Sequence, residues 1–424
     1  MNAKELKAHL RSGALKKYSN IYADVKRQEE RLASAIDAFT ALFGDDGRDL
    51  YIFSVPGRSE ILGNHTDHNR GRVLAGAIDR DVIAVAAKNS SGVINLHSEG
   101  FSPDSVRVAD TTDPDAFENY TSGALIAGIT NGLRLEGYEV GGFDAYTTTE
   151  VLKGSGISSS AAFEVMIGNI LNHLYNGGEI DNKEIAKLAQ YSENVFFGKP
   201  CGLMDQMACA VGGFVYIDFE KAEEPIVEPI RFSLGERGYA LCIINTGGNH
   251  ADLNEDYASV PREMKAVAGA LGREVLRGIE EGELISAIPT LRQTLGDRAI
   301  LRALHFIREN VRVSEAADAL RSGDIASFFG AVRRSGASSF QYLQNVYTNV
   351  NIKEQGLSLA LALADGFLGD VGALRVHGGG FAGTVQVYVP EDRLGEFTAL
   401  MDSVFGEGAT MTLFIRPLGA CRLF

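Results

Sequence analysis

Strand-like and helix-like segments follow one another in an irregular order along this chain of 424 residues. Runs rich in β-branched and aromatic residues, which are typical of strands, lie at 51–55, 73–87, 92–97, 213–218, 239–245 and 384–389. Apolar residues at helical spacing indicate helices at 20–44, 160–175, 183–196, 314–334 and 354–366. Because no regular strand–helix–strand alternation is present, we predict an α+β fold rather than a Rossmann or barrel fold.

The size and charge of the chain predict a two-domain enzyme. With 424 residues, 45% of them hydrophobic, the chain can form a large core, and chains of this length usually divide into domains. A shift to Glu, Lys and Pro at 219–230 indicates a boundary, so we predict domains at 1–225 and 226–424. The net charge of −15 and the lack of a Lys/Arg-rich block argue against a nucleic-acid or membrane partner.

Neither the amino-terminal residues nor the cysteines indicate export. The first residues are basic but contain no apolar stretch, and no run of 18 uncharged apolar residues occurs in the sequence. The four cysteines, Cys201, Cys209, Cys242 and Cys421, form no CxxC pair and have no metal-ligand spacing. We therefore predict a cytoplasmic protein with reduced, buried thiols.

The segment at 56–69, PGRSEILGNHTDHN, is the first candidate site. It offers a cation, imidazoles, carboxylates and amides directly after the strand predicted at 51–55. Pro56 and Gly57 are expected to end that strand, which would place the polar residues on a turn. Loops held at strand ends often carry chemistry, so we expect this turn to line an active site.

A second segment, KGSGISSSAAFEVMIGNILNHLYNG at 153–177, passes from glycine and serine into a helical pattern. Gly154 and Gly156 allow a ligand to approach the backbone, and unpaired amides at a helix start favour an anion. The segment matches neither the Walker nor the dinucleotide fingerprint. It predicts a phosphate-binding loop, with an ordinary capped turn as the alternative.

Two carboxylates mark the third segment, at 186–214. Asp205 lies in the apolar stretch GLMDQM, where a buried charge is costly unless it is paired, so a site role is predicted for it. Glu193, near the end of a predicted helix, becomes a candidate magnesium ligand when it is combined with the serine loop.

Three consecutive glycines mark the fourth segment, LRVHGGGFAGTVQVYV at 374–389. They predict either a sharp loop against a ligand or a tight hairpin. The neighbouring His377 is predicted to be structural.

In this order, the four segments resemble the GHMP small-molecule kinases, and the first resembles the galactokinases among them. GRSEILGNHTDHNRGRVL at 57–74 is similar to the signature of that family, roughly GR-x-N-x-IGEHTDYN-x-G-x-VL. GSGISSSAA at 154–162 resembles its ATP loop, and HGGGFAG at 377–383 resembles its third motif. The resemblance implies a two-domain α+β fold with the active site between the domains. It also implies transfer of phosphate from ATP, with Mg²⁺, to the anomeric hydroxyl of galactose, giving galactose 1-phosphate and ADP.

The resemblance also implies roles for the matching residues. Asp205 would be the catalytic base or an orienting carboxylate, and Arg58 would stabilise the charge that develops during transfer. The implied sugar contacts are Asn64, His65, Thr66, Asp67, Gly202 and Tyr257. The implied ATP loop comprises Gly154, Ser155, Gly156, Ile157, Ser158, Ser159 and Ser160. Mg²⁺ would be held by Ser160 and Glu193.

Two departures from the family pattern leave the substrate open. Galactokinases carry Glu where this chain has Asn64, at the contact with the C6 hydroxyl, and Tyr where it has His68. Loss of that carboxylate would remove repulsion against a carboxylate at C6, so galacturonate or another modified galactose is an alternative substrate. On this basis Asn64→Glu is expected to shift preference toward galactose. A non-catalytic sensor of sugar and ATP is a further alternative, against which the complete reacting set argues. By analogy with the family, a monomer is expected.

Overall fold

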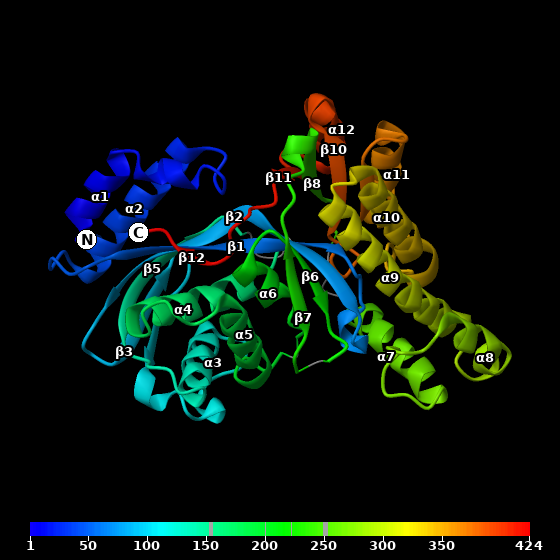
Figure 1. Ribbon diagram of the computed structural model, residues 1–424, viewed down its shortest axis with the longest axis horizontal. Helices are drawn as coiled ribbons and strands as arrows, with labels where there is room; N and C mark the ends of the chain where they lie inside the picture. The colour runs from blue at the N-terminus through cyan, green and yellow to red at the C-terminus, as the bar shows by residue number, and fades with distance from the viewer. Residues whose placement is uncertain (152–155, 200, 222, 249–252) are drawn as a thin grey trace.

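The computed structural model describes residues 1–151, 156–199, 201–221, 223–248 and 253–424. The predicted ATP-loop residues Gly154 and Ser155 lie outside these ranges. Two sheets, one of eight strands and one of four, organise the described part of the chain (Figure 1). The predicted fold class, a mixed α+β architecture, is confirmed.

The eight-stranded sheet is built on a long antiparallel pair, β1 and β2. The strand order is β12-β1-β2-β5-β3-β4, and β6 and β7 extend the sheet from the first part of β2. Among the strands that the structure describes, only β3 and β5 pair in parallel. The strands are β1 (Tyr51–Leu62), β2 (Arg72–Lys88), β3 (Val93–Ser98), β4 (Asp104–Arg107), β5 (Phe143–Thr149), β6 (Phe214–Asp218), β7 (Ile226–Ile230) and β12 (Cys421–Arg422).

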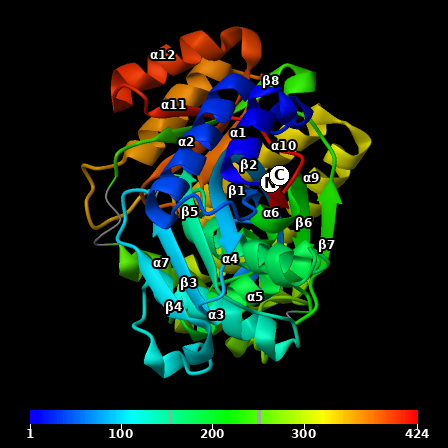
Figure 2. The same ribbon diagram turned by 90° about the vertical axis from the view of Figure 1, so that its left-hand side faces the viewer.

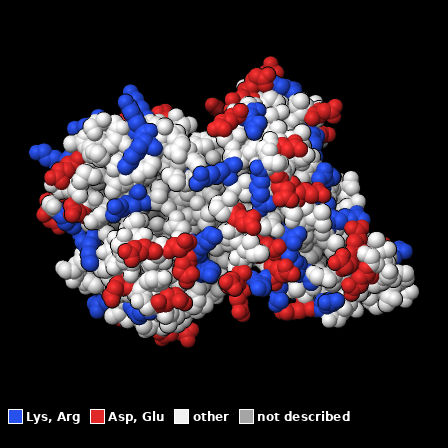
Figure 3. Space-filling model, in the orientation of Figure 1, with Lys and Arg blue, Asp and Glu red and all other residues white. Residues whose placement is uncertain are grey.

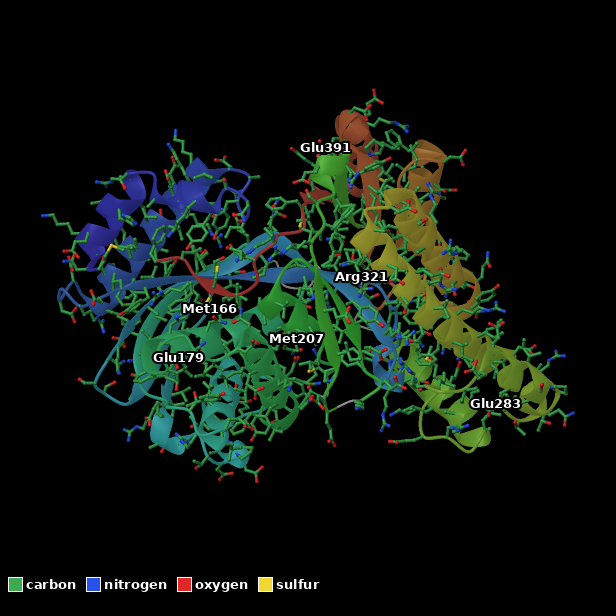
Figure 4. The ribbon with its side chains drawn as sticks, in the orientation of Figure 1. Met166, Glu179, Met207, Glu283, Arg321 and Glu391 are labelled. Carbon is green, nitrogen blue, oxygen red and sulfur yellow. The ribbon has the colours of Figure 1, made fainter. Side chains whose placement is uncertain are left out.

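Helices cover both faces of this sheet (Figures 1 and 2). On one face lie α3 (Ser122–Leu135), α4 (Ser159–Tyr175), α5 (Asn182–Val195) and α6 (Met204–Val211). Met166 and Met207 of this layer are fully buried in the core (Figure 4). On the other face lie α1 (Ala3–Arg11) and α2 (Val25–Phe43). Side chains of β2 alternate between the two faces, as the pleat requires. Ala84 and Ala86 pack in the core with α3 to α6, and Ile83 and Val85 pack in the core with α1 and α2.

The second sheet is antiparallel, in the order β11-β8-β10-β9. Its strands are β8 (Tyr239–Asn245), β9 (Ala373–His377), β10 (Thr384–Pro390) and β11 (Thr410–Leu413). One face packs on α9 (Asp297–Ser322) and α10 (Ile325–Ser338), and the other packs on α11 (Gly356–Leu368) and α12 (Leu394–Phe405). α7 (Asn254–Ala270) and α8 (Glu281–Thr294) pack on α9, and a short π-helix, Ser339–Leu343, follows α10.

Six short 3₁₀ turns complete the described elements: Ala14–Tyr18, Asp67–Asn69, Val108–Asp110, Pro114–Ala116, Gly235–Arg237 and Glu391–Arg393. None of the helices in the described ranges is long and apolar enough to cross a membrane. On the face drawn in Figure 3, acidic and basic side chains are interspersed.

Two sequence predictions about elements are wrong. Pro56 and Gly57 do not end the first strand, because a shift of register between Pro56 and Arg58 absorbs them and β1 continues to Leu62. Arg58 therefore lies on a strand, not on a turn. The helix predicted at 314–334 is two helices, since Gly323 (φ +75°) ends α9 and the Asp324 side chain caps α10.

The division at residue 225 stays a prediction. Two segments beyond it, β7 and β12, lie in the eight-stranded sheet. One hydrophobic core also runs from that sheet through α9 and α10 to the face of the second sheet that carries Leu241 and Ile243. The two sheets therefore share one packed interior.

Candidate active site

Three of the four predicted segments meet at Arg58. Its guanidinium donates two hydrogen bonds to the Asp205 carboxylate, Nε to Oδ1 at 2.8 Å and Nη2 to Oδ2 at 2.9 Å. Nη1 donates to the carbonyl oxygen of Gly156 at 2.6 Å. The hydroxyl of Ser158 donates to Asp205 Oδ2 at 2.5 Å. A strand, a helix start and a glycine–serine loop thus converge on one carboxylate.

The Arg58–Asp205 pair is asymmetric in its exposure. The side chain of Arg58 is 10% exposed, whereas that of Asp205 is 33% exposed. Burial alone would lower the pKa of Arg58, but the charge and hydrogen bonds of Asp205 outweigh it and raise that pKa. The pair therefore combines a fixed cation with a carboxylate that solvent, or a ligand, can reach. Such a pair can orient a hydroxyl and neutralise a developing negative charge.

The loop before α4 is shaped for close backbone approach. Gly156 has φ +73° and Ser158 has φ +61°, both in the left-handed region. Ser158 occupies the N-cap position of α4 but caps no amide, because its hydroxyl is bound to Asp205. Ile157 is 1% exposed and joins the hydrophobic core, so it anchors the loop. Ser159 and Ser160 form the first turn of α4, where unpaired amides favour an anion.

A second group of carboxylates joins α4, α5 and α6. Gln206 Nε2 donates to Glu193 Oε2 at 2.8 Å and to Glu164 Oε2 at 3.2 Å. Lys199 Nζ donates to Glu193 Oε1 at 3.1 Å. Burial, followed by the charge of Glu193, raises the pKa of Glu164 well above its usual value. The sequence analysis missed Glu164 and Lys199, although Glu164 lies four residues after Ser160, one helical turn along α4.

Ser160 and Glu193, the residues predicted to hold Mg²⁺, carry the oxygen ligands that this ion prefers. Glu164 Oε1 and Gln206 Oε1 are buried without a hydrogen-bond partner among the described residues. The available metal-ligand atoms are oxygens. Mg²⁺ needs few carboxylates when phosphate and water complete its coordination shell. Within the described ranges, no cluster of three or more His, Cys, Asp or Glu side chains could hold a metal by itself. Glu193 and Ser160 would therefore share the ion with a phosphate.

The predicted sugar segment begins where β1 ends. His65, at φ +58°, places its Nε2 2.9 Å from the carbonyl oxygen of Gly379. Burial and the nearby His68 lower the pKa of His65 to about 4, so its imidazole is neutral at pH 7. Thr66 is fully buried, and its hydroxyl lies between the carbonyl oxygens of Gly63 and Arg72. Thr66 therefore holds the turn in shape.

Asp67 and Gly202 lie against each other. A Cβ at Gly202 would stand 2.4 Å from Asp67 Oδ2, which leaves room for no side chain there. Burial would raise the pKa of Asp67, but the hydrogen bond and charge of His68 outweigh it and lower that pKa. Asp67 is thus an ionised hydrogen-bond acceptor, and the lack of a side chain at Gly202 leaves space for its carboxylate.

The glycine loop at 378–380 joins β9 to β10 and packs against α7. A Cβ at Gly379 would lie 2.8 Å from the ring of Tyr257, and one at Gly380 would lie 2.1 Å from the carbonyl oxygen of Asn345. Tyr257 donates to the Gly380 carbonyl at 2.7 Å, and burial raises its pKa to about 12. His377 is buried between Ser59 and Thr384, which agrees with its predicted structural role.

The four segments therefore form one site. The pair Arg58–Asp205 joins β1, α6 and the loop before α4. His65 and Tyr257 join the sugar segment and α7 to the glycine loop.

Comparison with known proteins gives the same picture from sequence and from fold. Residues 123–213 match the family described as GHMP kinases N terminal domain, and residues 37–88 match the galactokinase galactose-binding signature. A galactokinase of Streptomyces coelicolor is 31% identical over 382 residues, which cover 87% of this chain and 94% of that protein.

Two solved structures share the fold. The galactokinase of Lactococcus lactis, solved in complex with galactose, superposes with a TM-score of 0.78 at 23% identity and covers 92% of this chain and 99% of its own. The mevalonate kinase of Methanococcus jannaschii superposes with a TM-score of 0.60 at 16% identity and covers 87% and 99%.

Proposed function

The chain belongs to the galactokinase family of GHMP kinases, and from that premise we propose that it phosphorylates the anomeric hydroxyl of galactose with ATP. The products would be galactose 1-phosphate and ADP. The observation that carries the proposal is the bidentate Arg58–Asp205 pair beside the first turn of α4. The pair places the solvent-accessible carboxylate of Asp205 and the fixed cation of Arg58 next to the amides that would hold a phosphate.

Asp205 and Arg58 divide the work of transfer. Asp205 accepts the proton of the attacking hydroxyl, and its two bonds to Arg58 together with one from Ser158 hold it in place. Arg58 neutralises the charge that grows on the attacking oxygen and on the phosphoryl group. The amides of residues 156–160 hold the phosphates, in line with the predicted ATP loop. Ser160 and Glu193 would hold Mg²⁺, which supplies further charge neutralisation at the phosphates.

The two alternative functions are less well supported. Galacturonate would bring its own carboxylate into a segment that already holds Glu60 and Asp67, two carboxylates within electrostatic reach of each other. A non-catalytic sensor has no need of a carboxylate bound by both Arg58 and Ser158. The cytoplasmic location, the monomeric state and the individual site roles stay predictions.

Turnover is expected to require both galactose and a divalent cation. We expect ³¹P NMR of the purified protein with ATP, Mg²⁺ and galactose to show galactose 1-phosphate, and excess chelator to lower the rate by more than about 100-fold, because charge at the phosphates is then unneutralised. Excess Mg²⁺ should restore it. Faster turnover of galacturonate would favour the modified-sugar alternative, and binding of ATP and galactose without any product would favour the sensor.

Gly202→Ala is expected to raise KM for the sugar by about tenfold or more, because the new methyl group would displace the Asp67 carboxylate. KM for ATP should change little. Gly366→Ala, in open space on α11, is the matched control and should leave both constants unchanged. Equal KM values for the sugar in Gly202→Ala and wild type would contradict the placement of Asp67 at the sugar.

A further inference from the structure

Glu60 is a buried carboxylate within the sugar segment to which the sequence analysis gave no role. It lies on β1 two residues after Arg58, so the strand pleat places both side chains on the same side. The side chain of Glu60 is 9% exposed. Burial raises its pKa, and the charges of Arg375 and Arg58 oppose that rise, while the charge of Asp67 adds to it. Glu60 is thus within electrostatic reach of both a reacting residue and a predicted sugar contact.

Among the described residues, hydrogen-bond partners of the Glu60 side chain are found for one of its two oxygens. Oε1 accepts hydrogen bonds from Asn64 Nδ2 at 2.9 Å and from Arg375 Nη2 at 3.1 Å. Oε2 accepts none from the described residues. A carboxylate oxygen can accept two hydrogen bonds, so Oε2 retains its full capacity for a ligand.

The side chain of Asn64, by contrast, is already committed. Its Nδ2 donates one hydrogen to Glu60 Oε1 and the other to the carbonyl oxygen of Gly378, at 2.7 Å. Its Oδ1 accepts from Asn345 Nδ2 at 2.6 Å, and the residue is 1% exposed. The amide has no further hydrogen to give to a sugar hydroxyl. Asn64 instead ties β1 to the glycine loop.

The two residues are an exchanged pair relative to the family pattern given above. That pattern has Asn at the position of Glu60 and Glu at the position of Asn64. In this chain the acid stands on the strand and the amide on the turn, and they are bonded to each other. The amide–carboxylate pair is thus kept with its members exchanged.

Resting on the function proposed above, we propose that Glu60 supplies the carboxylate that accepts a hydrogen bond from a sugar hydroxyl, through Oε2. Asn64 is then a positioning residue, which orients Glu60 and fixes the glycine loop. The expected effect of Asn64→Glu then changes. That substitution would set a second carboxylate against Glu60 and remove the donor to Gly378, so it should harm galactose turnover instead of favouring it.

The test compares galactose with its 2-, 3-, 4- and 6-deoxy analogues in the full-length wild type and in Glu60→Gln. In the wild type, loss of the hydroxyl that Glu60 recognises should lower kcat/KM by about 10- to 100-fold, as expected for a hydrogen bond to a charged group. In Glu60→Gln, the penalty for that same analogue should shrink to a few-fold, while the other three penalties persist. Glu60→Asp keeps the charge beside Arg375 but draws the carboxylate back from the sugar, so it should reduce the same penalty. It replaces Glu60→Gln in the test if Glu60→Gln does not fold.

Two further variants separate recognition from packing. Glu309→Gln alters another buried carboxylate, which accepts from the Gly63 amide and from Arg312, and should leave all four penalties unchanged. The exchange variant Glu60→Asn/Asn64→Glu restores the order of the family pattern and should turn over galactose faster than Asn64→Glu alone.

The outcomes distinguish the inference from the function on which it rests. Equal penalties in wild type and both Glu60 variants would overturn the role of Glu60 and leave the kinase function standing. Absence of any sugar turnover by the wild type would overturn both. A shrunken penalty confined to one analogue would support both.

Discussion

Asp205→Asn is expected to lower kcat for galactose by about 10²- to 10⁴-fold, the range that a positioned general base contributes. Asparagine keeps the shape of the side chain and can still accept from Arg58, but it cannot take up the proton of the attacking hydroxyl. Sugar and ATP binding should change by only a few-fold, because Asp205 acts on the reacting oxygen. Single-turnover kinetics, with equilibrium binding of each ligand, measures this split between kcat and affinity.

Asp218→Asn provides the matched control for charge loss. Asp218, on β6, is likewise bound by arginine, with Arg72 at 2.8 Å and Arg277 at 2.9 Å, and it is buried. It lies outside the proposed site, so its substitution should lower the melting temperature without a comparable fall in kcat. If the two variants lost similar kcat, the effect of Asp205→Asn would be one of stability, and the role of base would fail.

Arg58→Lys is expected to lower kcat by about 10²- to 10³-fold, as for removal of a group that stabilises transition-state charge. Lysine keeps the positive charge but cannot contact both oxygens of Asp205 and the Gly156 carbonyl together. Affinity for ATP should fall much less than kcat, as measured by binding of ATP in the absence of sugar.

Arg277→Lys is the control for that change, because Arg277 binds Asp218 outside the site. It should cost stability but little activity. A fall in ATP affinity as large as the fall in kcat would contradict the assignment of Arg58 to the transition state and would favour a role in shaping the ATP loop.

Local patterns predicted about half of the strands and helices, whereas contacts between distant residues escaped prediction. The strand at 239–245 and the helix at 160–175 appear within a residue of the expected bounds, since a continuous pattern of one period fills each. The break inside 314–334 was visible as Gly323 followed by Asp324, the usual stop and start signals of helices. These signals were overlooked because the apolar residues before and after them were taken as one continuous helical pattern.

The site shows the same limit. The carboxylate of Asp205 was singled out because an unpaired charge in an apolar stretch is costly, and its partner is indeed Arg58. The contact of Glu60 with Arg375 could not be predicted from local sequence, because Arg375 lies 315 residues further along the chain, on β9 of the second sheet. Sequence spacing indicates which groups carry chemistry, but packing decides which of their atoms remain available.

The pairing of β12 with β1 bears on how this protein is made. Phe53 pairs with Arg422 and Ser54 with Cys421, so these two residues of β1 gain a strand partner on this edge from the last part of the sequence. During synthesis, β1 therefore leaves the ribosome with an unpaired edge, and it keeps that edge while helices and the whole second sheet are still being added. We infer that the edge of β1 at Phe53 and Ser54 is covered late, after the second sheet has been synthesised.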